Sequence, residues 1–349
     1  MAKDKKRKRD AGDVKPGGQS QQVDTSKPTA VFQPSGGRAH TLSVALPGSI
    51  IANAKSHDQK TYLAGQIARA LAVFCVDEVV VFDDEDKQTQ HTRHAIGEND
   101  YTAFSHPCHF LAHLLSYLET PPHLRKTLFP MHPNLRTAGT LPSLDMPHHL
   151  RANEWCEYRE GVVLKSDASG SSIDVGLAEP RVVEGAEIPQ GTRVTLRLGE
   201  PSSTTAEAVA PSTPREETGY YWGFNVRSCK SLSTVFTECP FDGGYNVSFG
   251  TSERGEALPT VLTQPALAQP EVQKYRHVLV AFGGVAGLET AGKNDLDLGL
   301  MGISGANVQE LFDHWVNVLP NQGSRTIRTE EAIWLGLMGL RGFVEQIGR

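Results

Sequence analysis

A strand–helix–strand unit near the start of the chain sets the strongest limit on its fold. Residues 41–46 form a short apolar run that Pro47-Gly48 ends, and residues 58–74 carry apolar side chains at helical spacing. Residues 77–82 contain a continuous apolar run, Val79 to Phe82, typical of a strand buried on both faces. A helix between two such strands is a βαβ unit, so we expect an α/β fold with a parallel sheet.

The pattern changes in the middle of the chain and then returns. Short strand candidates, separated by Gly, Pro and Ser, favour a small β-barrel or sandwich; they lie at 158–164, 173–175, 194–198 and 220–226, with a flexible loop at 199–218. Later residues again predict α/β elements: helices at 231–237, 307–316 and after Thr329, and strands at 245–249 and 277–282. We therefore expect an α/β domain over 39–152 and 231–349, with a β-rich module inserted at 153–230.

Charge is unevenly placed along the chain. The first 40 residues hold nine Lys/Arg and four Asp/Glu, whereas the whole chain has a net charge of −6. Residues 1–38 are also rich in Gly, Pro, Ser and Gln, which predicts a disordered basic tail. Its cluster Lys5–Arg9 is typical of a nuclear import signal or a nucleic-acid tether, and equally of a solvated charged tail. The remaining, acidic body does not by itself indicate nucleic-acid binding.

Composition excludes several other classes of protein. No apolar run approaches the ~20 residues of a membrane span, and the charged start of the chain does not resemble a secretory signal, so we expect no membrane partner. The five cysteines are scattered, and none forms a CxxC pair. This pattern suits a reducing compartment and disfavours a disulfide scaffold or a four-cysteine zinc site.

Two motifs come close to known sites but depart from them. Residues 287–294 nearly match the phosphate-binding loop GxxxxGK[ST], but Asn294 lacks the required hydroxyl, and residues 295–297 are not expected to start a helix. His109 and His113 are four residues apart, so one helical face can present both to a metal. Packing of these histidines in a helix is the favoured interpretation, and we predict no metal. His148-His149 is interpreted as a solvated turn after Pro147.

Three polar loops with glycines follow strand-like segments in the last third of the chain: Thr251–Gly255, Gly283-Gly284 and Asn317–Thr329. Ligands of open α/β sheets gather at the carboxyl ends of strands, and glycine lets a backbone approach a ligand closely. One pocket of backbone donors and acceptors would suit a flat neutral group such as adenine. Thr329 is a candidate N-cap for the final helix, with Glu330 and Glu331 in its first turn.

At these residues the chain resembles the SPOUT-class, trefoil-knotted RNA methyltransferases, in the branch with an inserted OB-like domain. The matching stretches span nearly all of 41–341: Thr41–Ile50, Thr61–Phe82, Pro147–Arg151, Tyr221-Trp222-Gly223, Gly250–Gly255, Arg276–Leu288 and Gly323–Ala332. The most similar members are nuclear proteins of eukaryotes. Some are associated with spindles and centromeres and linked to N3-methylation of a ribosomal RNA uridine.

The resemblance implies an α/β fold in which a knotted, Rossmann-like parallel sheet carries a small inserted β-barrel. It implies S-adenosylmethionine as cofactor, RNA (most specifically rRNA) as substrate, a homodimer, and a location in the nucleus or nucleolus. Carried over by position, the cofactor contacts are Arg254, Gly283, Gly284, Asn317, Gln322 and Thr329. Arg325 and Arg328 are the candidates for contact with the RNA base, where an arginine would stabilise negative charge, and Glu253 is a candidate base.

Two observations keep other interpretations open. Residues 152–232 hold eight positive and twelve negative side chains, which fits an RNA-gripping insert poorly. A non-enzymatic RNA- or chromatin-associated adaptor that keeps the fold is therefore the second hypothesis. A nucleotide hydrolase using Lys293 is the third, and the missing hydroxyl at Asn294 counts against it.

Overall fold

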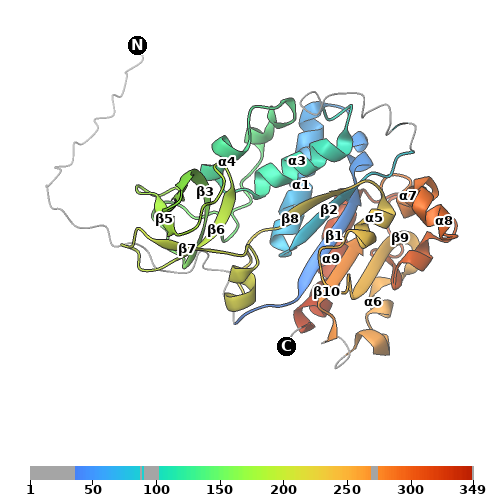
Figure 1. The fold of residues 1–349 in the computed structure, drawn as a ribbon. Coiled ribbons are helices and arrows are strands. Elements are labelled where there is room, and N and C mark those ends of the chain that lie inside the picture. Colours follow the sequence, from blue (N-terminus) through green and yellow to red (C-terminus); the bar gives the residue numbers. More distant parts are fainter. Residues whose placement is uncertain (1–35, 87–88, 90–101, 269–273, 348–349) are drawn as a thin grey trace, which may run out of the picture.

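The computed structural model describes residues 36–347, apart from 87–88, 90–101 and 269–273. Most of the predicted tail, with its cluster Lys5–Arg9, lies outside the described residues. Among the described helices, none has the length and apolar character needed to cross a bilayer. The described residues form a larger α/β part and a smaller β part, which lie side by side (Figure 1).

The larger part is built on six parallel strands in the order β11-β9-β10-β1-β2-β8. The strands are β1 (Thr41–Pro47), β2 (Glu78–Phe82), β8 (Asn225–Cys229), β9 (Val247–Ala257), β10 (His277–Ala281) and β11 (His314–Asn317). Every residue of β1 and β2 is buried, as expected for central strands of a parallel sheet. The predicted parallel sheet of an α/β fold is thus confirmed.

Helices cover both faces of this sheet. The residues of β1 alternate between two cores, with Val44 and Leu46 in one and Ala45 in the other, because successive side chains of a strand point to opposite faces. The first core lies under α1 (His57–Val73), α3 (Pro107–Glu119) and α9 (Thr329–Gln346). The second lies under α5 (Leu232–Thr237), α7 (Gly287–Asn294) and α8 (Leu296–Leu300).

Local sequence signals explain where the main helices begin. Ser56 accepts a hydrogen bond from the backbone of Gln59, and the Gln59 side chain accepts one from the backbone of Ser56, which makes a capping box for α1. Pro107 occupies the first turn of α3, where a missing N–H costs nothing. Shorter helical segments complete the chain: η1 (Gly48–Asn53), α4 (Pro122–Leu128), η3 (Pro133–Leu135), η4 (Ala138–Thr140), η5 (Pro214–Thr218), α6 (Leu258–Val261), η6 (Pro265–Leu267) and η8 (Val308–Leu311).

The smaller part is a five-stranded antiparallel sheet in the order β5-β4-β3-β6-β7. Its strands are β3 (Tyr158–Asp167), β4 (Gly170–Asp174), β5 (Arg181–Glu184), β6 (Arg193–Leu198) and β7 (Ala206–Val209). A bridge between Val182 and Thr205 brings the β5 and β7 edges together, so the sheet is nearly closed. Its own apolar core includes Val163, Ile173 and Leu196. The prediction of a small, separate, barrel-like β module is confirmed at this level.

Three predicted elements are wrong, and tertiary pairing explains each. The strand predicted at 220–226 is replaced by β8, which pairs with β2 at the edge of the large sheet. The helix predicted at 307–316 is a short 3-10 turn followed by β11, because pairing with β9 outweighs the helical spacing of its apolar residues. The predicted flexible loop 199–218 contains β7 and η5, and Arg215 of η5 is anchored on the backbone carbonyls of Arg38 and Ala39.

Candidate functional site

The three polar loops of the last third of the chain meet in one cavity. It has a volume of about 370 Å³ and lies at the carboxyl ends of β10 and β11, beside the middle of β9. Its walls come from Thr251–Arg254, Phe282–Gly287, Glu289, Asn317, Val318, Gln322, Thr326, Ile327, Thr329 and Ala332. The first segment is not the loop we predicted, because β9 continues through it to Ala257. All six residues predicted to contact a cofactor line this cavity, as does Glu253.

The glycine pair after β10 packs closely against its neighbours. A Cβ on Gly283 would lie 2.6 Å from the backbone nitrogen of Leu288, so a side chain there would displace the turn. A Cβ on Gly284 would lie 2.8 Å from Ser49 Oγ, so a side chain there would require Ser49 to move. The turn exposes backbone to the cavity and leaves room for a ligand beside it.

Hydrogen bonds between the loops hold the cavity in shape. Asn317 Nδ2 donates to the backbone carbonyl of Glu253 at 2.9 Å, which joins the end of β11 to β9. Thr329 Oγ1 donates to the backbone carbonyl of Gly283 at 2.9 Å, which joins the start of α9 to the glycine turn. Thr329 is thus the first residue of α9 rather than its N-cap; Arg328 is the N-cap, and its N–H is bound by Glu331.

The charged groups of the cavity stay largely accessible. The Arg254 side chain is 76% exposed and lies 3.8 Å from Glu289 Oε1, while Glu253 is exposed beside it. Ser252 Oγ donates to the same Glu289 oxygen at 3.3 Å. Glu289 was not among the residues predicted for the site, because residues 287–294 were considered only as a possible phosphate loop.

The segment that nearly matches a phosphate loop is a helix in the structure. Residues 287–294 form α7, and Asp295 caps α8 by accepting from the backbone of Asp297 and Leu298. The prediction that no helix starts at 295–297 is wrong. The rejection of a phosphate loop is strengthened, since a helix cannot wrap its backbone N–H groups around a phosphate.

The two arginines predicted to face the substrate lie outside the cavity wall. Arg325 and Arg328 are both exposed, and they flank the lining residues Thr326 and Ile327. Arg328 lies 3.8 Å from Glu330, and no ion pair joins Arg325 to another described residue. Both arginines are therefore exposed neighbours of lining residues and do not line the cavity themselves.

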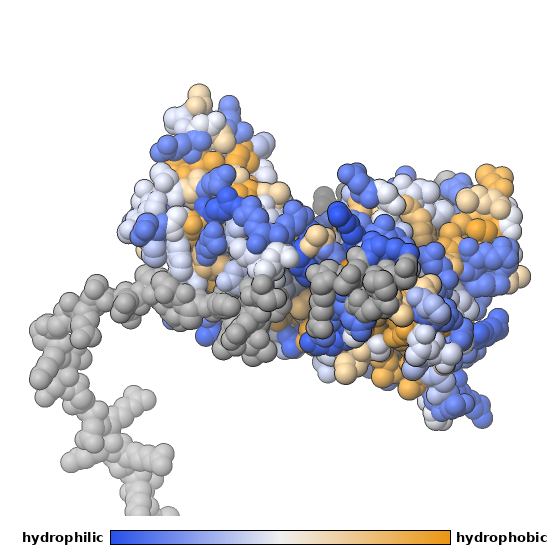
Figure 2. Space-filling model, turned by 90° about the horizontal axis from the view of Figure 1, so that it is seen from below, coloured by the Kyte–Doolittle hydropathy of each residue, from blue (hydrophilic) through white to orange (hydrophobic). Residues whose placement is uncertain are grey.

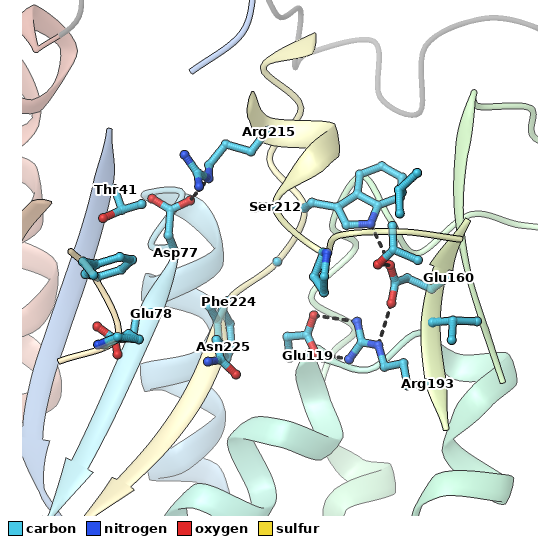
Figure 3. Close-up of a pocket in the computed structure, with 18 of the residues that line it drawn as sticks. Thr41, Asp77, Glu78, Glu119, Glu160, Arg193, Ser212, Arg215, Phe224 and Asn225 are labelled. Atoms are coloured by element: carbon cyan, nitrogen blue, oxygen red, sulfur yellow. Dashed lines mark hydrogen bonds and ion pairs between the residues drawn. The ribbon is translucent and has the colours of Figure 1, made fainter. Parts of the chain in front are cut away.

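A second cavity, of about 590 Å³, lies between the edge of the large sheet and the small barrel (Figure 3). Arg193 bridges two buried carboxylates, Glu119 and Glu160, with a 2.6 Å contact to each. Trp222 Nε1 also donates to Glu160. On the sheet side, Asp77 pairs with Arg38 and Arg215, as Glu78 does with Arg227. These charges are matched to protein partners, which is typical of a joint between domains.

The histidines predicted to form a solvated turn belong to this joint. His148 and His149 are both buried, and their Nε2 atoms lie 3.0 and 2.6 Å from the carbonyl oxygen of Glu119. Burial lowers the pKa of His149 to about 3. Burial alone would raise the pKa of Glu119, but Arg193 and His148 hold it well below its usual value. The prediction was wrong because these polar side chains fill a domain boundary that a local pattern cannot reveal.

Three histidines come together elsewhere, on the outer side of α3. His109 and His113 are joined by His132, and their closest ring nitrogens lie within 4.8 Å of one another. Asn134 already links all three, through its Nδ2 to His109 and His113 and through its backbone N–H to His132. Burial lowers the pKa of His113 to about 4, with His109 and His132 adding to the effect. We interpret the cluster as histidine rings packed around Asn134.

Comparison with known proteins places the chain in a family. Residues 41–340 match a family model described as "Putative RNA methyltransferase". A human protein named 28S rRNA (uridine-N(3))-methyltransferase is 43% identical over 323 residues, covering 89% of this chain and 81% of the relative. Its namesake from Drosophila melanogaster is 43% identical over 313 residues, covering 86% of this chain and 62% of the relative. The chain therefore belongs to this family of RNA methyltransferases.

Proposed function

We propose that this protein uses S-adenosylmethionine to methylate N3 of a uridine in ribosomal RNA. The observation that carries the proposal is the meeting of three separate loops in one cavity, with all six predicted cofactor residues in its wall. The names of the relatives, 28S rRNA (uridine-N(3))-methyltransferases, supply the acceptor.

The cavity fits a nucleoside cofactor in size and chemistry. Its volume of about 370 Å³ lies within the ~300–1,000 Å³ range of small-ligand sites. The glycine turn brings backbone polar groups to the ligand, and Asn317 and Gln322 add amide groups. Glu289 places a carboxylate in the wall, which complements a cationic ligand. When bound, S-adenosylmethionine supplies a methyl group activated by its sulfonium.

The protein's own contribution is mainly positioning. Thr329 and Asn317 lock the loops together, so the cavity presents a fixed surface before the ligand arrives. Arg325 and Arg328 are exposed on either side of the lining residues Thr326 and Ile327, and we propose that an RNA base approaches there. Either guanidinium would stabilise the negative charge that develops on uracil when N3 loses its proton. Glu253 stays a prediction as the base.

We also propose the finer architecture that the family resemblance implies. The large sheet belongs to the SPOUT class with a C-terminal trefoil knot, and the five-stranded module, within 153–230, is OB-like and contacts RNA. The parallel sheet, the gathering of a β9 segment with the loops after β10 and β11, and the nearly closed barrel support this proposal. Seen from below, a hollow with a mainly hydrophilic surface separates the two lobes (Figure 2).

A homodimer is proposed on the exposed apolar face of α1 and α9. Tyr62 is 59% exposed and Met338 is 63% exposed, both unusual for such large apolar side chains. Trp334 connects the two helices, since it lines a shallow pocket with Tyr62 and packs edge-on against Phe74. Because α9 starts in the cavity wall, a second subunit on this face would lie close to the site.

The nucleus or nucleolus, where ribosomal RNA is modified, is the proposed location.

Calorimetry and RNA mass spectrometry test the function directly. The full-length protein is expected to bind S-adenosylmethionine saturably and to form N3-methyluridine in ribosomal RNA. Arg254→Ala should weaken cofactor binding. Absence of binding by the unmodified protein, or equal binding by Arg254→Ala and parent together with no methylated uridine, would refute the proposal and favour a non-enzymatic adaptor.

A further inference from the structure

A buried carboxylate lies directly behind the glycine turn of the cavity. Asp84 follows β2 and is only 8% exposed. Its Oδ2 accepts a hydrogen bond from Ser49 Oγ at 2.6 Å, whereas its Oδ1 is buried and has no hydrogen-bond partner among the described residues. An unpaired buried carboxylate oxygen is costly, so its retention calls for a reason beyond packing.

Strand register brings this pair to the cavity. Pro47 of β1 lies opposite Phe82 of β2, and Ala45 lies opposite Ala281 of β10. The residues just beyond these strand ends therefore meet at one edge of the sheet. A Cβ on Gly284 would lie 2.8 Å from Ser49 Oγ and 3.3 Å from Asp84 Oδ2. Since Gly284 lines the cavity, a single glycine separates the cavity from the Ser49–Asp84 pair.

The environment of Asp84 suits a group that takes up a proton. Burial raises the pKa of its carboxyl, the neighbouring Asp83 and Glu85 raise it further, and the hydrogen bond from Ser49 opposes them. Asn294 of α7 binds only the backbone carbonyl of Asp84. Ser49 is half-buried, whereas Asp84 is buried, so Ser49 is the more accessible residue of the pair. Glu253, in contrast, is exposed. A base is most effective when its pKa is close to the working pH.

We propose that Ser49 and Asp84 form the proton-accepting pair for the methylated base, an inference that rests on the proposed function. As the N3–CH3 bond forms and the CH3–S bond breaks, the sulfur keeps the electron pair of the broken bond. The proton of N3 passes to the Ser49 hydroxyl, which gives its own proton to Asp84. The protonated carboxyl then returns the proton to solvent after the methylated RNA leaves. No further reactant is needed.

Single-turnover methylation of ribosomal RNA across a range of pH tests this pair in the full-length protein. Asp84→Asn is expected to lower the rate at least 100-fold, in the range that general base catalysis contributes. Its affinity for S-adenosylmethionine should stay within about twofold of the parent. The rise of the rate with pH through the pKa of Asp84 should disappear. Ser49→Ala should lose rate, and Ser49→Thr, which restores a hydroxyl, should regain most of it.

Asp86→Asn is the matched control, because it makes the same change two residues away at an exposed position. It should leave rate and pH profile unchanged. An Asp84→Asn protein with parental rate would overturn this inference alone, as would a loss of cofactor affinity parallel to the loss of rate. Equal rates for Ser49→Ala and Ser49→Thr would also overturn it. An unmodified protein that binds cofactor but methylates no RNA would overturn both this inference and the proposed function.

Discussion

The two main cavities of this protein differ in how their polar groups are satisfied. The cavity between the domains is larger, about 590 Å³, yet its carboxylates are held by Arg193, Arg215 and Arg227. The cavity at the strand ends is smaller, about 370 Å³, but it offers a glycine turn, amides and largely exposed charges. In an interface between domains the polar groups are paired with other protein groups, whereas in a binding site some remain available to a ligand. Size alone would favour the cavity between the domains, whose charges already have protein partners.

The largest expected effect comes from removing the positive charge of Arg193 in the cavity between the domains. Arg193→Met leaves Glu119 and Glu160 buried without their cation, and breaking such a network costs about 3–5 kcal/mol. We expect the free energy of unfolding, measured by urea denaturation, to fall by that amount.

Arg197→Met is the matched control on the same strand. The Arg193 and Arg197 side chains are both 29% exposed, but the partners of Arg197, Glu207 and Glu217, are more than half exposed. Exposed ion pairs contribute little to stability, so this change should be mild. Equal losses in the two variants would show that the Glu119–Arg193–Glu160 bridge is not what holds the joint.

A second test concerns the ligand cavity. Gly283→Ala would put a methyl group 2.6 Å from the backbone nitrogen of Leu288, and such overpacking costs roughly 1–3 kcal/mol. The displaced turn should weaken S-adenosylmethionine binding roughly 10- to 100-fold in calorimetry, equivalent to about 1.4–2.7 kcal/mol.

Gly323→Ala serves as its control, because a Cβ at Gly323 meets no atom within 4 Å and the residue lies in the third loop of the same cavity region. It should bind the cofactor as the parent does. A Gly283→Ala protein with unchanged affinity would argue against the glycine turn as part of the cofactor site.

The third and smallest expected effect is the pH dependence of stability that buried His149 causes. Because burial lowers the pKa of His149 to about 3, the unfolded chain binds its proton near pH 6.5 while the folded protein does not. The contribution of His149 to the free energy of unfolding is therefore fully present above about pH 6.5. It is lost progressively as the pH falls toward 3, because only the unfolded chain then binds the proton. Between pH 7 and 5.5 we expect a loss of about 1 kcal/mol in the free energy of unfolding.

His149→Gln removes the titrating ring while keeping an amide near the Glu119 carbonyl. The fall in stability between pH 7 and 5.5 should be smaller in this variant than in the parent. His40 and His113, whose pKa values burial also lowers, to about 4, remain in both proteins and cancel in the comparison. A slope unchanged by the substitution would show that His149 does not titrate with folding.

Prediction from sequence was successful where local pattern and tertiary role agree. The runs at 41–46 and 77–82 became central strands, and the three glycine-containing segments came together around one cavity. It failed where an element depends on a distant partner. The apolar residues at 308, 311, 312 and 315 fit a helix, but residues 314–317 pair with β9 as a strand. His148 and His149 look solvated in the sequence, but folding buries them against the carbonyl of Glu119.

The sequence alone determined the α/β class, the small β module and the identity of the loops that line the cavity, because periodicity and glycine placement act over short distances. Only the tertiary structure decided which charges are free. Glu119, Glu160 and Arg193 are far apart in the chain, and folding makes them a satisfied bridge. Ser49, Asp84 and Gly284 are also far apart in the chain, and the register of β1, β2 and β10 brings them together. Such meetings depend on strand order, which no local stretch of sequence encodes.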